Sequence, residues 1–254
     1  MDLQGKIAVV TGASSGIGEA TARRLDAAGM TVVAVARRAD RLQALAAAGQ
    51  AILPHVADVT VDEQVQGLAD AVAEQHGACH VLVNNAGFTR RERFTRTEGH
   101  DPMEDFEAVL DANLFGVVRC MLAFEHLLAA SAPARVVNVA SVGGKLGFGP
   151  ASYVTSKFAV VGLTEAVRTE WLPRGISVCA VNPGFARTEG FPQEQLMAGP
   201  FRRLVITPDE VARVIVEVAA SGAAERTVPR WYRPLVVARH IAARPFWGIG
   251  RRLL

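Results

Sequence analysis

Short apolar runs alternate with longer amphipathic stretches along most of the chain. The runs have no helical period and predict strands at Ile7–Val10, Thr31–Ala36, Ala51–His55, Val81–Asn84, Arg135–Ala140 and Ser177–Asn182. The stretches between them have a helical period and predict helices at Gly18–Ala28, Ala39–Ala48, Val61–His76, Phe106–Ala130, Tyr153–Leu172 and Pro208–Ala220. Short, wholly apolar strands separated by helices indicate a parallel sheet covered on both faces. The expected fold class is α/β, a doubly wound parallel sheet in one three-layer domain, with ligands at the carboxyl ends of the strands.

Composition narrows the class of protein. A chain of 254 residues, half of them hydrophobic, is long enough to bury one large core. The three cysteines are scattered and lie in no C-x-x-C or His/Cys cluster, so we expect neither a metal site nor a disulfide. The first predicted strand starts near Lys6, which leaves no room for a signal peptide, and no window approaches the about eighteen apolar residues of a membrane span. We therefore expect a cytoplasmic protein.

Charge is distributed unevenly. The net charge is +2, yet residues 226–254 contain seven arginines and no acid, so the rest of the chain carries −5 by subtraction. Aromatic residues such as Trp231 and Trp247 interleave with these arginines. Such a segment suits a terminal helix packed on its own domain, a peripheral contact with an anionic membrane, a subunit contact, or a cover over a cleft. A nucleic-acid partner is not expected, because the chain contains no recognised nucleic-acid-binding module.

A glycine-rich turn follows the first predicted strand and precedes the first predicted helix. It reads Thr11-Gly-Ala-Ser-Ser-Gly-Ile-Gly18. In such a turn, Gly12 permits the tight bend, Gly16 lets backbone approach a phosphate, and Gly18 lets the helix lie close to the strand. A dinucleotide pyrophosphate binds at the N-terminus of a helix in this arrangement. The sequence therefore predicts a dinucleotide site that also includes Ser14, Ser15 and Ile17.

A phenol and an ammonium group are spaced one helical turn apart at Tyr153 and Lys157. Residues i and i+4 share a helix face, so the two head groups can approach the same small volume. A nearby cation favours the phenolate and lowers the pKa of the tyrosine from about 10, which makes it a usable general acid or base. Ser141, upstream of a glycine-rich loop, could hold a substrate oxygen beside the phenol.

Taken together, these motifs resemble the short-chain dehydrogenase/reductase family in order and spacing along residues 6 to about 190. They are Thr11–Gly18, Asn84-Asn-Ala-Gly87, Asn113, Ser141, Tyr153 with Lys157, and Asn182-Pro-Gly184 followed by Thr188. The resemblance implies a Rossmann fold, with a cofactor-binding catalytic domain over 1–225 and an arginine-rich extension of that domain over 226–254. It also implies a homo-oligomer, either a dimer or a tetramer. The carboxyl end departs from the family, because the usual closing Thr-Gly and Asp-Gly-Gly strand is replaced by Glu225–Arg230, which could be the last strand.

The end of the second predicted strand selects between nicotinamide cofactors. Enzymes built for NAD commonly have an acid at this position to bind the ribose 2′-hydroxyl, but here the residue is Ala36. Arg37 can grip a 2′-phosphate bidentately, with Arg38 assisting and Ser14 or Ser15 donating from the turn. Many relatives also have a basic residue where this chain has Ser15. The prediction is NADP(H), and the alternative is two solvated arginines at a helix start.

The resemblance assigns further cofactor contacts. Asp58 resembles the acid that contacts adenine, although an ordinary turn or N-cap aspartate is an equal alternative. Gly87 lets backbone pass the ribose, and Thr188 is placed to bond the nicotinamide carboxamide. The remaining implied contacts are Val59, Asn85, Ala86, Pro183 and Gly184.

The implied catalytic residues are Asn113, Ser141, Tyr153 and Lys157. Ser141 and Tyr153 would donate hydrogen bonds to a carbonyl oxygen as it gathers negative charge, and Tyr153 would deliver the proton. Lys157 would lower the pKa of Tyr153 and hold the nicotinamide ribose. Asn113 would hold a water that links Lys157 to solvent.

The substrate side is expected to be apolar. The expected contacts besides Ser141 and Tyr153 are Val142, Leu146, Phe148, Phe185 and Phe191. Such a lining favours a lipophilic or aromatic ketone, or its alcohol. Residues 185–200 are predicted to form a lid, and residues 89–103 to form an exposed, mobile polar insertion near the mouth of the cleft.

The leading hypothesis is an NADP(H)-dependent carbonyl reductase or alcohol dehydrogenase. One alternative is a redox-neutral epimerase or dehydratase that retains its NADP. The other is a non-catalytic NADP-binding protein at a membrane surface. Neither alternative suits the sequence as well, because the long substrate domain of the first is absent and binding alone does not need Ser141 with Tyr153.

Overall fold

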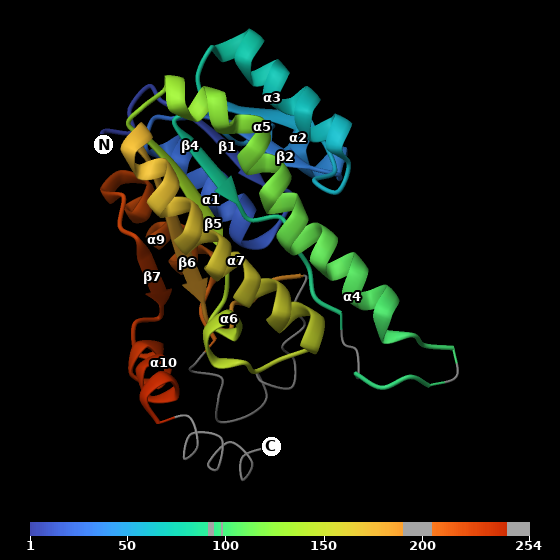
Figure 1. Ribbon diagram of the computed structural model, residues 1–254. Coiled ribbons are helices and arrows are strands. Elements are labelled where there is room, and N and C mark those ends of the chain that lie inside the picture. The colour runs from blue at the N-terminus through green and yellow to red at the C-terminus, as the bar shows by residue number, and fades with distance from the viewer. Residues whose placement is uncertain (91–93, 98, 190–204, 243–254) are drawn as a thin grey trace.

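A computed structural model describes residues 1–90, 94–97, 99–189 and 205–242. Seven parallel strands form one sheet in the order β3-β2-β1-β4-β5-β6-β7 (Figure 1). The strands are β1 Ile7–Thr11, β2 Thr31–Ala36, β3 Ile52–Val56, β4 Val81–Asn84, β5 Ala134–Val139, β6 Ile176–Pro183 and β7 Glu225–Val228. The chain crosses from β3 back past β1 to reach β4, so the strand order reverses between β1 and β4, where such folds bind ligands.

Helices cover both faces of the sheet (Figure 1). They are α1 Gly16–Ala27, α2 Ala39–Ala47, α3 Asp62–His76, α4 Pro102–Leu110, α5 Gly116–Ala130, α6 Gly143–Leu146, α7 Ala151–Trp171, α9 Pro208–Ser221 and α10 Tyr232–Ile241. A π-helical turn, η1 Asp111–Phe115, joins α4 to α5. A short 3-10 turn, η2 Leu172–Arg174, follows α7.

Alternation along each strand divides the buried side chains into two cores. Val10 on β1 packs in the core that contains α1, α2 and α9, where Leu25 and Ile215 are fully buried. Its neighbour Val9 packs in the other core, beneath α3, α5 and α7, where Phe124 is fully buried. The three-layer, doubly wound fold predicted from the apolar runs is confirmed.

The predicted elements match the observed ones closely, with one correction. Each predicted strand agrees with its observed bounds to within one residue. The helix predicted over 106–130 starts earlier, at Pro102, because Asp101 caps it by accepting a hydrogen bond from the Met103 amide. It is also interrupted by η1, a feature that a regular apolar period does not show.

The carboxyl-terminal residues that the structure describes belong to the same fold. Strand β7 pairs with β6, so the strand suggested at Glu225 is present. Helix α10 follows it and packs beside α6 (Figure 1). Tyr232 of this helix is buried in a small cluster with Val142 and Leu146. Among the described residues, no helix combines the length and the apolar character needed to cross a bilayer.

Candidate active site

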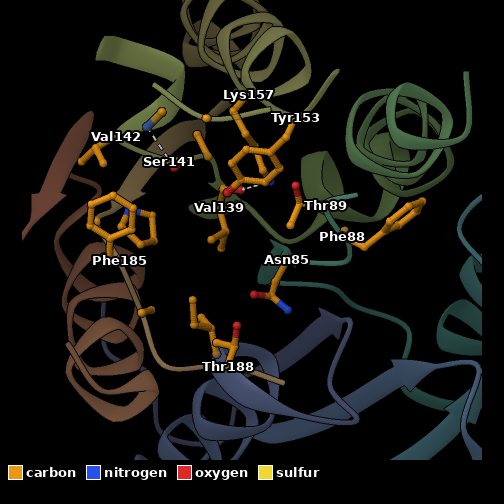
Figure 2. Close-up of a pocket in the computed structure, with 18 of the residues that line it drawn as sticks. Asn85, Phe88, Thr89, Val139, Ser141, Val142, Tyr153, Lys157, Phe185 and Thr188 are labelled. Atoms are coloured by element: carbon orange, nitrogen blue, oxygen red, sulfur yellow. Dashed lines mark hydrogen bonds between the residues drawn. The ribbon is translucent and has the colours of Figure 1, made fainter. Parts of the chain in front are cut away.

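A cavity of about 340 Å³ opens at the carboxyl ends of β1, β4, β5 and β6. Its lining includes these residues that the sequence predicted: Gly12, Ser15, Gly16, Ile17, Asn85, Ala86, Gly87, Ser141, Val142, Leu146, Phe148, Tyr153, Lys157, Pro183, Gly184, Phe185 and Thr188. Figure 2 shows Asn85 and Thr188 at one end and Ser141, Tyr153 and Lys157 at the other. The fold thus brings most of the predicted cofactor and catalytic residues around one space.

The end of the cavity that contains Asn85 and Thr188 is called the cofactor end below. Glycines shape it because side chains would not fit there. Gly12 and Gly16 have φ of 67° and 57°, a region that side chains strongly disfavour. A Cβ at Gly18 would lie 2.2 Å from the Gly12 carbonyl oxygen. Helix α1 begins at Gly16, and its N-cap residue Ser15 makes no side-chain capping bond. The uncapped amides and the cradle beside them fit an anionic group such as a pyrophosphate.

Thr11 ties the ends of β1 and β4 together beneath this cradle. Its Oγ1 accepts hydrogen bonds from the amides of Asn85 at 3.0 Å and Ala86 at 3.1 Å. The Asn85 Nδ2 in turn donates to the Thr11 carbonyl at 3.0 Å. These bonds fix the two strand ends relative to each other, a role that sequence reasoning did not assign to Thr11.

The two arginines after β2 take different positions. The Arg38 Nη2 donates to the hydroxyls of Ser15 at 2.8 Å and Ser14 at 3.0 Å, so its guanidinium lies against the glycine-rich turn. Its Nη1 pairs with Glu189 at 3.3 Å. Arg37 has a 72% exposed side chain and pairs with Asp58 at 3.4 Å. Arg37 was predicted to be the main arginine for a 2′-phosphate, whereas in the structure Arg38 is the arginine that lies at the turn.

Asp58 and Val59 lie outside the cavity lining, as do Ser14, Gly18, Arg37, Arg38 and Asn113. Burial raises the pKa of Asp58, but hydrogen bonds from Thr60 and the charge of Arg37 outweigh it and leave the pKa below its ordinary value. The Asp58 Oδ1 accepts from the amide and hydroxyl of Thr60, so Asp58 does form an ordinary turn. Val59 packs against Gly116 at the start of α5.

Ser141, Tyr153 and Lys157 converge at the other end of the cavity (Figure 2). The Ser141 Oγ accepts a hydrogen bond from the Gly143 amide at 3.0 Å and bonds the Tyr153 hydroxyl. The Lys157 Nζ donates to the Val139 carbonyl at 2.9 Å and lies 5.8 Å from the centre of the Tyr153 ring. Helix α7 carries both Tyr153 and Lys157, one turn apart, as the spacing predicted.

The electrostatics of this pair differ from the sequence-based expectation. Burial raises the pKa of Tyr153 above its ordinary value, and the hydrogen bond with Ser141 acts in the opposite direction. Burial also lowers the pKa of Lys157 to about 8. The predicted lowering of the Tyr153 pKa by Lys157 is therefore not produced by the protein groups alone, because burial penalises both charged forms.

The Asn113 side chain hydrogen-bonds to the backbone of Phe88 and to the side chain of Ser156. It is fully buried in η1, and its Oδ1 accepts from the Phe88 amide while its Nδ2 donates to the Phe88 carbonyl, both at 2.9 Å. Its Nδ2 also donates to the Ser156 hydroxyl at 3.1 Å, which donates to the Tyr153 carbonyl at 2.7 Å. Asn113 thus connects the chain after β4 to α7. The water relay that the resemblance implies stays a prediction.

The substrate end is walled by apolar side chains. Val142, Leu146, Phe148 and Phe185 line it, as predicted. Phe191 and most of the proposed lid lie outside the described residues. Of the insertion predicted at 89–103, Thr89 lines the cavity instead of facing solvent, and Arg90 pairs with Asp105 on α4 at 2.7 Å.

Tyr232 is a further wall residue that sequence reasoning did not assign to the site. A Cβ at Gly184 would lie only 2.3 Å from the Tyr232 Cε2, so the ring packs directly on the turn after β6. Burial raises the pKa of Tyr232 to about 12 and so keeps the phenol neutral. A cover over the cleft is one of the roles predicted for the arginine-rich extension, residues 226–254. The signal in the sequence was its interleaved aromatic residues and arginines. Other lining residues that sequence reasoning did not assign are Phe88, Thr89, Val139, Ala140, Gly149, Pro150 and Ala186.

Comparisons with known proteins agree with this geometry. The sequence model of the family described as short chain dehydrogenase matches residues 6–197. A 3-oxoacyl-[acyl-carrier-protein] reductase of Synechocystis is 37% identical over 234 residues, covering 87% of this chain and 92% of that protein. A farnesol dehydrogenase of Aedes aegypti is 39% identical over 210 residues, covering 77% and 83%. A short chain dehydrogenase from Burkholderia cenocepacia, solved in complex with NADP, superimposes with a TM-score of 0.83 at 27% identity, covering 100% of this chain and 99% of that one.

Proposed function

This chain belongs to the short-chain dehydrogenase/reductase family, and we propose that it is an NADP(H)-dependent carbonyl reductase or alcohol dehydrogenase with a lipophilic substrate. Family membership makes it an oxidoreductase that uses NAD or NADP. One observation carries the finer proposal. Ser141, Tyr153 and Lys157 line the same cavity as the glycine cradle, so a bound cofactor and a carbonyl group could meet at the phenol.

The arginine at the turn supports NADP(H) over NAD(H). Arg38 reaches both serine hydroxyls of the turn, and no carboxylate stands at Ala36 to repel a 2′-phosphate. A guanidinium in this position suits a phosphate, because it offers several parallel donors. The Burkholderia relative was solved with NADP, which is consistent with this assignment.

The protein side chains would then bind the carbonyl oxygen of the substrate and supply the proton. Bound nicotinamide would supply hydride in the reduction and accept it in the oxidation. The Ser141 and Tyr153 hydroxyls would donate hydrogen bonds to the carbonyl oxygen, and Tyr153 would pass its proton to the developing alkoxide. The raised pKa of Tyr153 keeps it protonated before the reaction, which suits a general acid. Lys157, with its ammonium next to the phenol, would stabilise the phenolate left behind.

The lipophilic substrate follows from the wall of the cavity. Val142, Leu146, Phe185 and Tyr232 offer an apolar surface, and no phosphate-binding cluster of basic residues lies beside them in the described lining. Farnesol, the substrate named for the Aedes relative, is a lipophilic alcohol. The apolar wall and this relative support a lipophilic substrate, and within that class we propose a ketone or a secondary alcohol.

Replacement of Tyr153 by Phe tests the reaction. NADPH consumption by purified protein is followed with aliphatic, aromatic and steroid-like ketones, in parallel for the wild type and the variant. We expect the variant to lose about 10²- to 10⁴-fold in kcat while its Kd for NADPH stays unchanged, because only the proton donor is removed. Turnover by the variant at the wild-type rate would exclude Tyr153 as the acid.

The same assay separates the alternative functions. Tight NADPH binding with no turnover of any carbonyl would favour the redox-neutral enzyme or the non-catalytic binding protein. Within the residues that the structure describes, no specific contact favours either alternative. The Ser141–Tyr153 hydrogen bond next to Lys157 is an arrangement that cofactor binding alone does not require.

The surface of the extension leaves two predictions open. Helix α10 buries Tyr232 but exposes Trp231, Leu235 and Ile241, and arginines flank them. This surface supports either a peripheral membrane contact or a contact between subunits of a homo-oligomer. Co-sedimentation with anionic vesicles and light scattering of the purified protein distinguish the two.

A further inference from the structure

Most polar side chains around the cavity already have a hydrogen-bond partner in the protein or a proposed catalytic role. The polar side chains in its described lining are Ser15, Asn85, Thr89, Ser141, Tyr153, Lys157, Thr188 and Tyr232. Ser141, Tyr153 and Lys157 form the catalytic end. The remaining ones decide which other polar groups of a ligand the cavity can recognise.

Three of these side chains are committed to the cofactor end. The Ser15 hydroxyl accepts from Arg38 at 2.8 Å. The Asn85 Nδ2 donates to the Thr11 carbonyl at 3.0 Å. Thr188 lies against the turn, where its Cγ2 would be 3.1 Å from a Cβ at Gly16. None of these three is placed on the substrate side.

Tyr232 brings its ring to the substrate wall but not an accessible hydroxyl. The Tyr232 oxygen is buried and lies close to Gly184, where it would be 3.1 Å from an added Cβ. The backbone amide of Phe185 is near enough to oppose the effect of burial on its pKa. A substrate in the cavity would therefore contact the ring of Tyr232 as an apolar surface.

Thr89 remains, and the structure fixes its position. It follows Phe88, whose backbone N–H and C=O are both held by the Asn113 side chain at 2.9 Å. Thr89 is half-buried, and Figure 2 shows it beside Tyr153 at the edge of the cavity. Its hydroxyl donates to the neighbouring Arg90 carbonyl across a long 3.4 Å, a weak bond that a better acceptor on a ligand could replace.

The wall opposite Thr89 is apolar. Val142 and Phe185 lie across the cavity from Thr89 in Figure 2, and Leu146 packs with Val142 and Tyr232. A carbonyl held at Ser141 and Tyr153 would thus have a hydroxyl on one flank and hydrocarbon on the other. Such a site orients an asymmetric ketone, because a polar group turned toward the apolar wall would lose its hydrogen bonds.

We propose that Thr89 is a specificity-determining residue whose hydroxyl binds a second oxygen of the substrate. The preferred substrates are then ketones with a hydrogen-bonding oxygen on one side of the carbonyl and an apolar chain on the other. This inference rests on the proposed carbonyl reductase function and specifies which ketones it favours.

Two variants and two probes test the assignment. Thr89→Val keeps the shape of the side chain and removes the hydroxyl, whereas Thr89→Ser keeps the hydroxyl. Ethyl acetoacetate carries the second oxygen, and 2-heptanone has a chain of the same length without it. We expect Thr89→Val to lower kcat/KM about 10-fold for the ester and less than about 2-fold for 2-heptanone, since one neutral hydrogen bond is lost. Thr89→Ser should retain the wild-type preference, and the Kd for NADPH should be the same for all three proteins.

Other outcomes overturn the assignment and can be told apart from failure of the proposed function. An equal loss with both probes would mean that Thr89 only supports the wall, and an unchanged preference would mean that its hydroxyl does not reach the substrate. Calorimetric binding of each probe to the NADP⁺ complex gives a second measurement, in which only the ester should lose affinity in Thr89→Val. If the wild type reduces neither ketone but binds the ester in a Thr89-dependent way, the reductase function fails while the Thr89 contact stands. Binding of neither probe overturns the Thr89 contact.

Discussion

The two ends of the cavity are built by different means. The cofactor end is held by backbone and by part-buried hydrogen bonds, such as those between Thr11 and Asn85, which join the glycine-rich turn after β1 to the end of β4. The substrate end is held by apolar side chains from distant parts of the chain, including Tyr232 of α10 against Gly184. Hydrogen-bonded backbone tolerates little change, whereas apolar contacts can be repacked at small cost. The comparison indicates that the cofactor end depends on hydrogen-bonded backbone at recognisable motifs, whereas the substrate end depends on apolar packing between segments that have no such motif.

Alanine at two glycines gives the sharpest contrast between the ends, and the largest expected effect. In Gly18→Ala, the new Cβ meets the Gly12 carbonyl oxygen at 2.2 Å and the Asn85 Nδ2 at 2.5 Å, neither of which can move without breaking the cradle. Overpacking of this kind costs about 1–3 kcal/mol, so we expect NADPH affinity to fall about 10- to 100-fold or the protein to unfold more easily. Calorimetric titration of NADPH and thermal unfolding measure the two effects.

Gly184→Ala supplies the matched variant. Its Cβ meets the Tyr232 Cε2 at 2.3 Å. The Tyr232 side chain can move away or be replaced by a smaller residue. We expect the double variant Gly184→Ala/Tyr232→Leu to recover most of the activity that Gly184→Ala loses. No single substitution at Asn85 should rescue Gly18→Ala, because the clash with the backbone of Gly12 remains. Rescue at both ends, or at neither, would remove the contrast between a fixed and an adaptable end.

The arginines after β2 test the cofactor end itself, with an effect of similar size that is confined to NADPH affinity. Arg38→Leu removes the guanidinium that lies against Ser14 and Ser15. We expect the Kd for NADPH to rise about 10- to 100-fold, as for loss of charge-assisted hydrogen bonds, while the Kd for NADH changes little. Arg37→Leu is the matched control and should have the smaller effect, because Arg37 is mostly exposed and pairs with Asp58. A larger effect from Arg37 would restore the assignment made from sequence.

Local signals account for what could be predicted from the sequence. Six strands were placed to within one residue because each is a short, mostly apolar run, and the glycine-rich turn and Tyr153–Lys157 are local spacings. The choice between Arg37 and Arg38 was not local. Arg38 is the N-cap residue of α2, and the direction of its side chain depends on how that helix starts beside the turn.

The remaining site features depend on tertiary structure. The contact of Tyr232 with Gly184 joins residues far apart in the chain, and no periodicity encodes it. The position of Thr89 depends on the clamp between Phe88 and Asn113, which η1 brings into place. The pKa of Tyr153 required knowledge of burial, because the i, i+4 spacing shows the cation but not the loss of water around the phenol.

Lys157 lies where the two ends meet, and it supplies the last and smallest expected effect. Burial lowers its folded-state pKa to about 8, from 10.5. Below pH 8 the group is protonated in the folded and unfolded states, so the full cost of burying the charge is present. Between pH 8 and about 10.5 the folded protein releases this proton while the unfolded chain keeps it, so this group makes the free energy of unfolding rise with pH.

Lys157→Met removes the charge. Relative to the variant, the wild type should gain about 2–3 kcal/mol over that interval, below the limit of about 1.4 kcal/mol per pH unit because the group is only partly titrated at either end. Urea unfolding of both proteins followed by tryptophan fluorescence from pH 7 to 10.5 measures the difference. Parallel stability curves would show that the Lys157 ammonium stays hydrated in the folded state and that burying it does not reduce stability.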